Sequence, residues 1–226
     1  MKFNFQQGET LLIDKPKGMT SFDVVKKVRS HIHAKKVGHA GTLDPMATGL
    51  LVICTGRATK TIDQYKDLPK EYTGTITLGA ITPSYDAETE VSETYDVSAI
   101  DQEAIYHAAE QLTGSIQQLP PAYSAVKIGG ERSYKKARRG EDVQPQPRDV
   151  VVHTFEISDL ALPYVHFRIE CSKGTYIRTL AYDFGRLLDN GGYLNALRRT
   201  RIGSLTVEDA WTLKGLISTI QENNSA

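Results

Sequence analysis

The chain has 226 residues, 40% of them hydrophobic and 24% charged, which is typical of an ordinary globular protein with a sizeable core. Its 27 basic and 27 acidic side chains give a formal net charge of zero, so overall charge does not predict nucleic-acid binding and only local clustering could. No stretch is apolar enough to span a membrane and the amino terminus lacks a signal-peptide core, so a cytoplasmic location is expected.

The first elements expected along the chain are a strand at residues 8–16 and a helix that Thr20 or Ser21 can cap. The apolar positions of this helix recur at helical spacing: Phe22, Val25, Val28 and Ile32. A glycine-rich loop is expected at 39–49. The apolar run 49–56 and the alternating run 72–79 then predict two strands.

The next segments change in character. Residues 84–103 contain acidic residues and no Lys or Arg, which is typical of a solvated loop leading into a helix. Ser98 and Asp101 mark the start of that helix and Gly114 its end. Its inward positions are expected to be Ile105, Ala108, Ala109 and Leu112. Residues 120–148 form a long basic excursion that has prolines at both ends and bears tyrosines.

Two strands are expected at 150–158 and 164–172, and a helix at 176–188. Strand groups alternating with helices predict one α+β domain with a large mixed or mainly antiparallel sheet flanked by helices and loops. Cys54 and Cys171 lie in apolar, strand-like runs, so we expect buried free thiols rather than a disulfide or a metal pair.

Asp44 is the first candidate for chemistry. It is the one acidic side chain in HAGTLDPMATG, residues 39–49, between glycines and a proline. An aspartate in such a loop most often caps a turn. The alternative is that the loop presents the carboxylate to a substrate.

Arg178 is the second candidate, in the segment 171–181 where a strand meets a helix. It can be an exposed arginine beside Tyr176, with the tyrosine packed on the sheet. Alternatively, it reaches a carboxylate, which would lower the pKa of that acid by about 1–3 units and keep it ionised as a nucleophile.

A third feature is a scatter of basic positions that could form a positive surface for a polyanion. Taken singly, each is an ordinary solvated charge. The positions are Lys15, Lys17, residues 26–36, Lys60, residues 127–139, Arg198, Arg199 and Arg201. Tyr123, Tyr134 and Tyr176 could stack on unpaired bases, or could be core tyrosines.

Other motifs fit poorly. Residues 56–60, GRATK, lack the spacing of a phosphate-binding loop, and no GxGxxG follows a strand. GTLDP faintly resembles a phosphoryl-accepting aspartate loop, but the acidic pair that would hold magnesium is not recognisable. No metal site is expected.

Six segments, in this order, resemble the TruB family of RNA pseudouridine synthases. They are LLIDKPKGMTS (11–21), KKVGHAGTLDPMATGLLVICTGRATK (35–60), KEYTGTITLG (70–79), PPAYSAVKIGGERSYKKARRG (120–140), CSKGTYIRTLAYDFG (171–185) and LRRTRIG (197–203). The resemblance covers nearly the whole chain, and GHAGTLDPMATGLL is highly specific. Within this family, the chain is similar to the stand-alone tRNA enzymes rather than to the enzymes that depend on a guide RNA.

The resemblance implies the pseudouridine synthase fold and an isomerase that converts the T-loop uridine of tRNA to pseudouridine. Asp44 would be the catalytic nucleophile, acting either on the sugar C1′ or on the base, and Arg178 would pair with it. Tyr72 would stack on the target base, which must be flipped out at a cost of a few kcal/mol. The reaction needs neither a metal nor any other cofactor.

Further roles follow from the same resemblance. His39 would help to hold the rearranged T loop, and Tyr176 and Leu197 would line the uridine pocket. Lys15 and Lys60 would lie near the substrate. Asp86 would support the site from the acidic segment 82–90, where Glu88 replaces a common glycine.

The resemblance also implies one catalytic domain over residues 1–226, with a basic flap at about 121–147 closing over the RNA loop. No PUA domain is visible after it. The expected partner is the T arm of tRNA, with no membrane, no obligate protein partner and a monomeric state. Two alternatives remain: a non-catalytic RNA-binding or RNA-folding factor, and a magnesium-dependent phosphotransfer enzyme.

Overall fold

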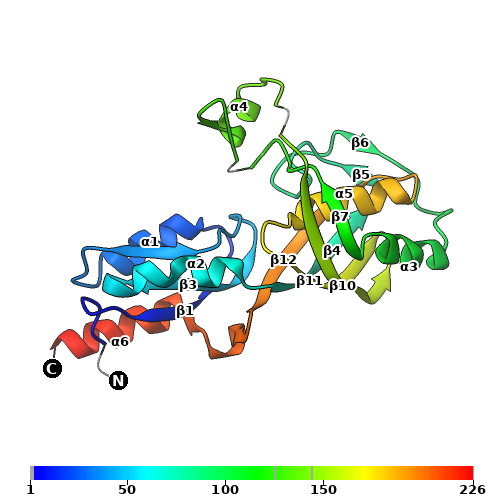
Figure 1. Ribbon diagram of the computed structural model, residues 1–226. Coiled ribbons are helices and arrows are strands. Elements are labelled where there is room, and N and C mark those ends of the chain that lie inside the picture. Colours follow the sequence, from blue (N-terminus) through cyan, green and yellow to red (C-terminus); the bar gives the residue numbers. More distant parts are fainter. Residues whose placement is uncertain (1–2, 125, 144, 226) are drawn as a thin grey trace. The chain divides into compact units, whose positions relative to one another are not determined.

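The computed structural model describes residues 3–124, 126–143 and 145–225 (Figure 1). Its elements in chain order are β1 (Thr10–Lys15), α1 (Ser21–Arg29), β2 (Val37–Ala40), β3 (Thr48–Thr55), the 3-10 helix η1 (Gly56–Thr61), α2 (Ile62–Asp67), β4 (Lys70–Leu78), β5 (Ala80–Ile81), β6 (Glu93–Thr94), α3 (Gln102–Gln111), β7 (Gly114–Gln118), β8 (Lys127–Ile128), β9 (Glu131–Arg132), α4 (Ser133–Arg138), β10 (Arg148–Ala161), β11 (Tyr164–Cys171), α5 (Ile177–Leu187), β12 (Gly192–Ile202), β13 (Leu205–Thr206), the 3-10 helix η2 (Val207–Asp209), β14 (Trp211–Thr212) and α6 (Leu213–Ser225).

Ten strands of the described chain form one sheet in the order β14-β1-β3-β12-β4-β11-β10-β7, with β2 also paired to β3 and β13 to β12. The pairs β1–β14 and β3–β12 are parallel, whereas β1–β3 and β10–β11 are antiparallel. The predicted α+β fold with a large mixed sheet is therefore confirmed.

The chain divides into two compact units. The first unit contains Met1–Tyr72 and Leu197–Ala226, and the second contains Thr73–Ala196. The chain passes from one unit to the other within β4 and again within β12. In the described residues, no helix is long and apolar enough to cross a membrane.

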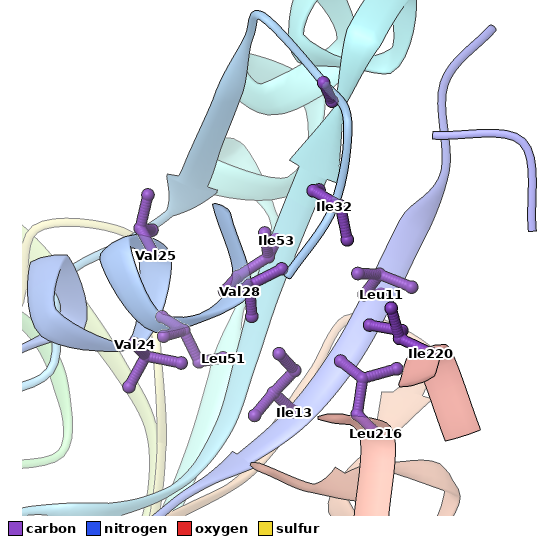
Figure 2. Close-up of a cluster of buried hydrophobic side chains, with 11 residues drawn as sticks. Leu11, Ile13, Val24, Val25, Val28, Ile32, Leu51, Ile53, Leu216 and Ile220 are labelled. Atoms are coloured by element: carbon purple, nitrogen blue, oxygen red, sulfur yellow. The ribbon is translucent and has the colours of Figure 1, made fainter. Parts of the chain in front are cut away.

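The first unit is built around β3, which is buried on both faces. One cluster packs β1 and β3 against α1 and α6, and Figure 2 shows its side chains pointing toward one another. Its members include Leu11, Ile13, Val24, Val28, Leu51, Ile53, Leu216 and Ile220. A second cluster covers the alternate positions Leu50, Val52 and Cys54. Burial on both faces explains why residues 49–56 are a continuous apolar run rather than an alternating one.

Helix α1 begins as predicted, and its expected apolar positions are buried with one exception. Thr20 is the N-cap: its hydroxyl accepts from the Asp23 N–H at 3.0 Å, and the Asp23 carboxylate accepts from the Thr20 N–H at 3.0 Å. The expectation that Phe22 points inward is wrong, because its side chain is 59% exposed and Lys26 lies 4.8 Å above its ring. The buried residues of the helix are Ser21, Val24, Val25 and Val28, and Ile32 just beyond its end is buried as well.

In the second unit the hairpin of β10 and β11 follows its pattern. Val165, Phe167, Ile169 and Cys171 are buried along β11, and the residues between them are not. Helix α3 starts after Asp101, and all four of its expected inward residues are buried. Helix α5 runs from Ile177 to Leu187, close to the predicted bounds. Cys54 and Cys171 are buried free thiols, as predicted.

Two other expectations need comment. The acidic segment 84–103 is not exposed to solvent throughout, because Ser84 and Asp86 are buried and the Ser84 hydroxyl donates a hydrogen bond to the Asp86 carboxylate. The basic excursion contains the short hairpin β8–β9 followed by α4, and within it the Ser133 hydroxyl donates to the Ala122 carbonyl at 2.5 Å. Its closure over RNA stays a prediction.

Candidate functional site

Asp44 lies in the connection of a β-hairpin. His39 and Ala40 belong to β2 and Thr48 belongs to β3, so the loop is residues 41–47 and not the whole of 39–49. The two strands are antiparallel, with His39 opposite Ile53. The Asp44 side chain is half-buried at this connection.

The loop is held by the segment that leads into α1. The Ser21 hydroxyl accepts from the Leu43 N–H at 2.8 Å and donates to the Leu43 carbonyl at 3.2 Å. On the other side of Asp44, the Pro45 carbonyl accepts from the Gly18 N–H at 2.8 Å. The backbone is therefore fixed immediately before and after the candidate nucleophile.

Two basic residues expected on a positive surface are in fact buried in this unit. Lys15 is 0% exposed, and its ammonium donates to the carbonyls of Met19 at 2.6 Å and Pro45 at 3.4 Å. Arg199 is 1% exposed, and its guanidinium donates to the carbonyls of Leu50 and Gly41 at 2.7 and 3.2 Å. In both cases backbone carbonyls accept the hydrogen bonds that water would otherwise accept, which allows the charge to be buried. The local sequence around Lys15 and Arg199 does not reveal these acceptors.

Arg198 and Arg201, the two basic residues near Arg199 in the sequence, are paired with acidic side chains. Arg198 makes two hydrogen bonds to Asp14, at 3.0 and 2.8 Å. Arg201 lies 3.3 Å from Glu71. The expected positive surface is therefore wrong for residues 198–201, whereas Lys60 is exposed at the end of η1 as that expectation requires.

His39, Tyr72 and Leu197 also lie in the first unit. Burial lowers the pKa of His39, although a hydrogen bond with the Gly41 backbone acts in the opposite direction. Among the described residues, its Nδ1 atom is buried without a hydrogen-bond partner. Tyr72 and Leu197 are buried on β4 and β12, and the Leu197 carbonyl accepts from the Thr48 hydroxyl at 3.4 Å.

Arg178 and Asp86 lie in the second unit, where they form a buried ion pair. The Nε of Arg178 is 3.4 Å from an Asp86 oxygen, so the exposed reading of Arg178 is wrong. The guanidinium also donates to the carbonyls of Ser84 at 3.2 Å and Tyr123 at 3.0 Å. Asp86 in turn accepts from the Ser84 hydroxyl at 2.5 Å and the Glu88 N–H at 3.0 Å.

Tyr176 is held by a residue that the sequence did not single out. The buried side chain of Gln118, on β7, accepts from the Tyr176 N–H at 2.7 Å and donates to its carbonyl at 3.0 Å. Arg148 lies 5.3 Å from the centre of the Tyr176 ring. No local signal marks Gln118, because its partner is 58 positions away.

Each unit thus gathers part of the expected site. The first contains Asp44, Tyr72, His39, Leu197, Lys15 and Lys60, and the second contains Arg178, Tyr176 and Asp86. The pairing of Asp44 with Arg178 stays a prediction. In the described part of the chain, no group of three or more His, Cys, Asp or Glu side chains is arranged to hold a metal ion.

Comparison with known proteins identifies the family. Residues 29–177 match the model "TruB family pseudouridylate synthase (N terminal domain)", and residues 178–226 match "tRNA pseudouridylate synthase B C-terminal domain". The chain is 48% identical over 213 residues to a protein of Flavobacterium johnsoniae named tRNA pseudouridine synthase B, covering 91% of this chain and 93% of that one. A protein of the same name from Chloroherpeton thalassium is 47% identical over 224 residues, covering 97% and 93%.

Solved structures agree on the fold. The chain is similar to one in the crystal structure of a Cbf5-Nop10-Gar1 complex, with a TM-score of 0.74 and 27% identity. It is also similar to one in the archaeal box H/ACA sRNP Nop10-Cbf5 complex, with a TM-score of 0.71 and 25% identity. Each match covers 98% of this chain, which spans 57% of the length of either solved chain. The sheet is that of the pseudouridine synthase fold, and the chain belongs to the TruB family of pseudouridine synthases.

Proposed function

We propose that this protein is a tRNA pseudouridine synthase, an isomerase that converts the T-loop uridine of tRNA to pseudouridine. Family membership carries this proposal, together with relatives named tRNA pseudouridine synthase B that align over more than nine-tenths of the chain. The fixed hairpin loop bearing Asp44 supports it, because a nucleophile must be held at a defined place.

Asp44 is the nucleophile in this proposal: its carboxylate forms a transient bond to the ribose C1′ or to the base, and this bond breaks again before the product leaves. The bond between the ribose C1′ and the uracil N1 breaks, the base turns, and C1′ bonds to C5. The proton on C5 is lost and N1 gains one, so the reaction is a net isomerisation and requires no oxidant or hydrolysis. Tyr72 stacks on the flipped base, and stacking returns about 1–3 kcal/mol of the cost of extruding it.

Arg178 pairs with Asp44 and keeps it ionised in this proposal. Its guanidinium is well suited to such a task, because Asp86 and the carbonyls of Ser84 and Tyr123 fix its orientation. Asp86 acts through Arg178 and does not touch the uridine.

Most of the remaining expected residues bind the RNA. A neutral His39 holds the rearranged T loop, Tyr176 and Leu197 line the uridine pocket, and Lys60 contacts the substrate nearby. Lys15 acts mainly by fixing the Pro45 carbonyl next to the nucleophile. We further propose a cytoplasmic monomer that recognises the T arm without an obligate protein partner or cofactor, as one catalytic domain with a flap at 121–147.

The test is to incubate the purified protein with an unmodified T-arm stem-loop and map pseudouridine chemically, with and without EDTA. Product is expected at the single T-loop uridine in both conditions. Asp44→Asn should lower the rate by about 10³-fold or more while binding persists. The matched control is Asp63→Asn, an exposed aspartate of the same unit that pairs with Lys66 at the surface, which should stay fully active. Full activity of Asp44→Asn would refute the assigned role.

A further inference from the structure

Arg199 bridges the first residue of the loop that carries Asp44 and the strand β3 that follows this loop. Its guanidinium donates through Nε to the Leu50 carbonyl and through Nη2 to the Gly41 carbonyl, at 2.7 and 3.2 Å. Gly41 comes three positions before Asp44 and Leu50 six positions after it. One buried side chain from β12 therefore sets the distance between the chain entering the loop and the chain leaving it.

The backbone of Arg199 also touches this connection. Gly49 of β3 is paired with Arg199 of β12 in parallel register. A Cβ atom at Gly49 would lie 2.2 Å from the Arg199 carbonyl oxygen, and Gly49 has a φ of 102°. Only glycine allows so close an approach in this conformation. Backbone and side chain of Arg199 thus hold the same short segment.

The chemistry of this position is specific to arginine. Both acceptors are neutral backbone carbonyls, and the residue is almost completely buried. Burying a charge is costly, and an apolar residue would suit a strand that needs only to pack. A planar guanidinium presents donors in a rigid fork that can reach two separate carbonyls, whereas a lysine ammonium acts as a point donor on a flexible stem.

We propose that Arg199 is a positioning residue for catalysis: it fixes the Gly41-to-Leu50 connection and thereby the orientation of the Asp44 carboxylate. This inference rests on the proposed role of Asp44 as nucleophile. Arg199 acts through the loop backbone and does not contact the uridine. The neighbouring Arg198 has a different task, since it pairs with Asp14 at the partly exposed side of the same strand.

The test compares Arg199→Lys with the matched control Arg198→Lys, using the T-arm stem-loop as substrate. Arg199→Lys should lower kcat by about 10- to 100-fold, because a small misplacement of a reacting group has an effect of that size. Its KM, its Kd for the stem-loop and its Tm should stay close to those of the wild type. Arg198→Lys should leave kcat within about twofold of the wild type.

A rescue experiment covers the case in which the lysine variant folds poorly. Arg199→Ala is assayed with guanidinium at non-denaturing concentrations and, separately, with methylammonium, which cannot bridge two carbonyls. Recovery of kcat with guanidinium alone supports the positioning role. Equal recovery with both cations, no recovery with either, or a loss of kcat in Arg199→Lys that matches its loss of folded protein would overturn it.

Three further results separate this inference from the proposed function. If the wild type makes pseudouridine and Arg199→Lys retains its kcat, only the positioning role is wrong. A rise in KM with unchanged kcat would likewise overturn it, because it would indicate contact with the substrate. If the wild type makes no pseudouridine, the proposed function itself is wrong.

Discussion

Arg178 and Asp86 form an ion pair that is almost fully enclosed: Nε and Oδ2 are 3.4 Å apart, and the two side chains are 6% and 1% exposed. Such a pair adds little stability relative to apolar residues of the same shape, yet removal of one partner leaves a buried charge uncompensated. The pair therefore makes the second unit sensitive to substitution at either position.

We expect Asp86→Ala to lower the free energy of unfolding by about 3–5 kcal/mol, because it strips Arg178 of its partner and the Glu88 N–H of its acceptor. Urea unfolding measures this loss. The matched control is Glu156→Ala, which breaks the exposed pair with Arg168 and should cost no more than about 1 kcal/mol. Equal losses in the two variants would contradict the importance of burial.

Adjacent substitutions at Thr20 and Ser21 should separate helix capping from loop support. Thr20→Ala removes the N-cap of α1 and should cost about 1 kcal/mol with little loss of kcat. Ser21→Ala leaves the buried Leu43 N–H without its acceptor and should cost about 1–3 kcal/mol. Only Ser21→Ala should also reduce kcat, since Leu43 precedes Asp44. Thermal unfolding and steady-state kinetics of both variants check this, and an equal effect on kcat would argue against it.

His39 should stay neutral at physiological pH. Burial lowers its pKa in the folded protein below the ordinary histidine value of 6.5, and the positive charge of Arg199 acts in the same direction. Between the two values the unfolded chain binds the proton and the native protein does not, so stability rises with pH through this range and falls as the solution is acidified. NMR titration of the His39 ring measures the shift directly. In Arg199→Met the pKa should move upward, and a downward movement would contradict the electrostatic contribution.

Asp183 should make the protein less stable at neutral pH than in mild acid. Burial raises the pKa of Asp183 to about 6, against the opposing charge of Arg186. Between 3.8 and 6 the native protein binds a proton that the unfolded chain has released, so this group's contribution to stability falls as pH rises. Asp183→Asn should remove that slope and add on the order of 2 kcal/mol at pH 7, after allowance for partial exposure. Unfolding free energies of both proteins across this range test it, and parallel curves would refute the assignment.

Patterns within single elements predicted much of the fold. Alternation placed Val165 and Phe167 inside along β11, and helical spacing placed Ile105 and Ala108 inside on α3. These residues are buried because the period of the element matches its apolar positions. On α1 the spacing predicted the burial of Val25 and Val28 correctly but not that of Phe22, which is exposed. Val24 is buried in addition, and so is Ser21, whose hydroxyl bonds to Leu43, a partner outside the helix that its spacing cannot reveal.

The surroundings of the charged residues could not be predicted in the same way. Lys15, Arg178 and Arg199 were compatible with an exposed surface, yet all three are buried. Their burial is possible because carbonyl groups and one carboxylate bond to them, and these partners lie up to 158 positions away along the chain, as in the bond of Arg199 to Gly41. Periodicity describes a residue's face within its own element and carries no information about such distant acceptors.

Gln118 satisfies both backbone polar groups of Tyr176 at the point where α5 begins. Because the N–H and the carbonyl of Tyr176 already have hydrogen-bond partners, a ligand that contacts this residue would interact mainly with its ring and hydroxyl. Ligand preference at position 176 would then depend on the side chain. A substitution there could change this preference without disturbing the start of α5.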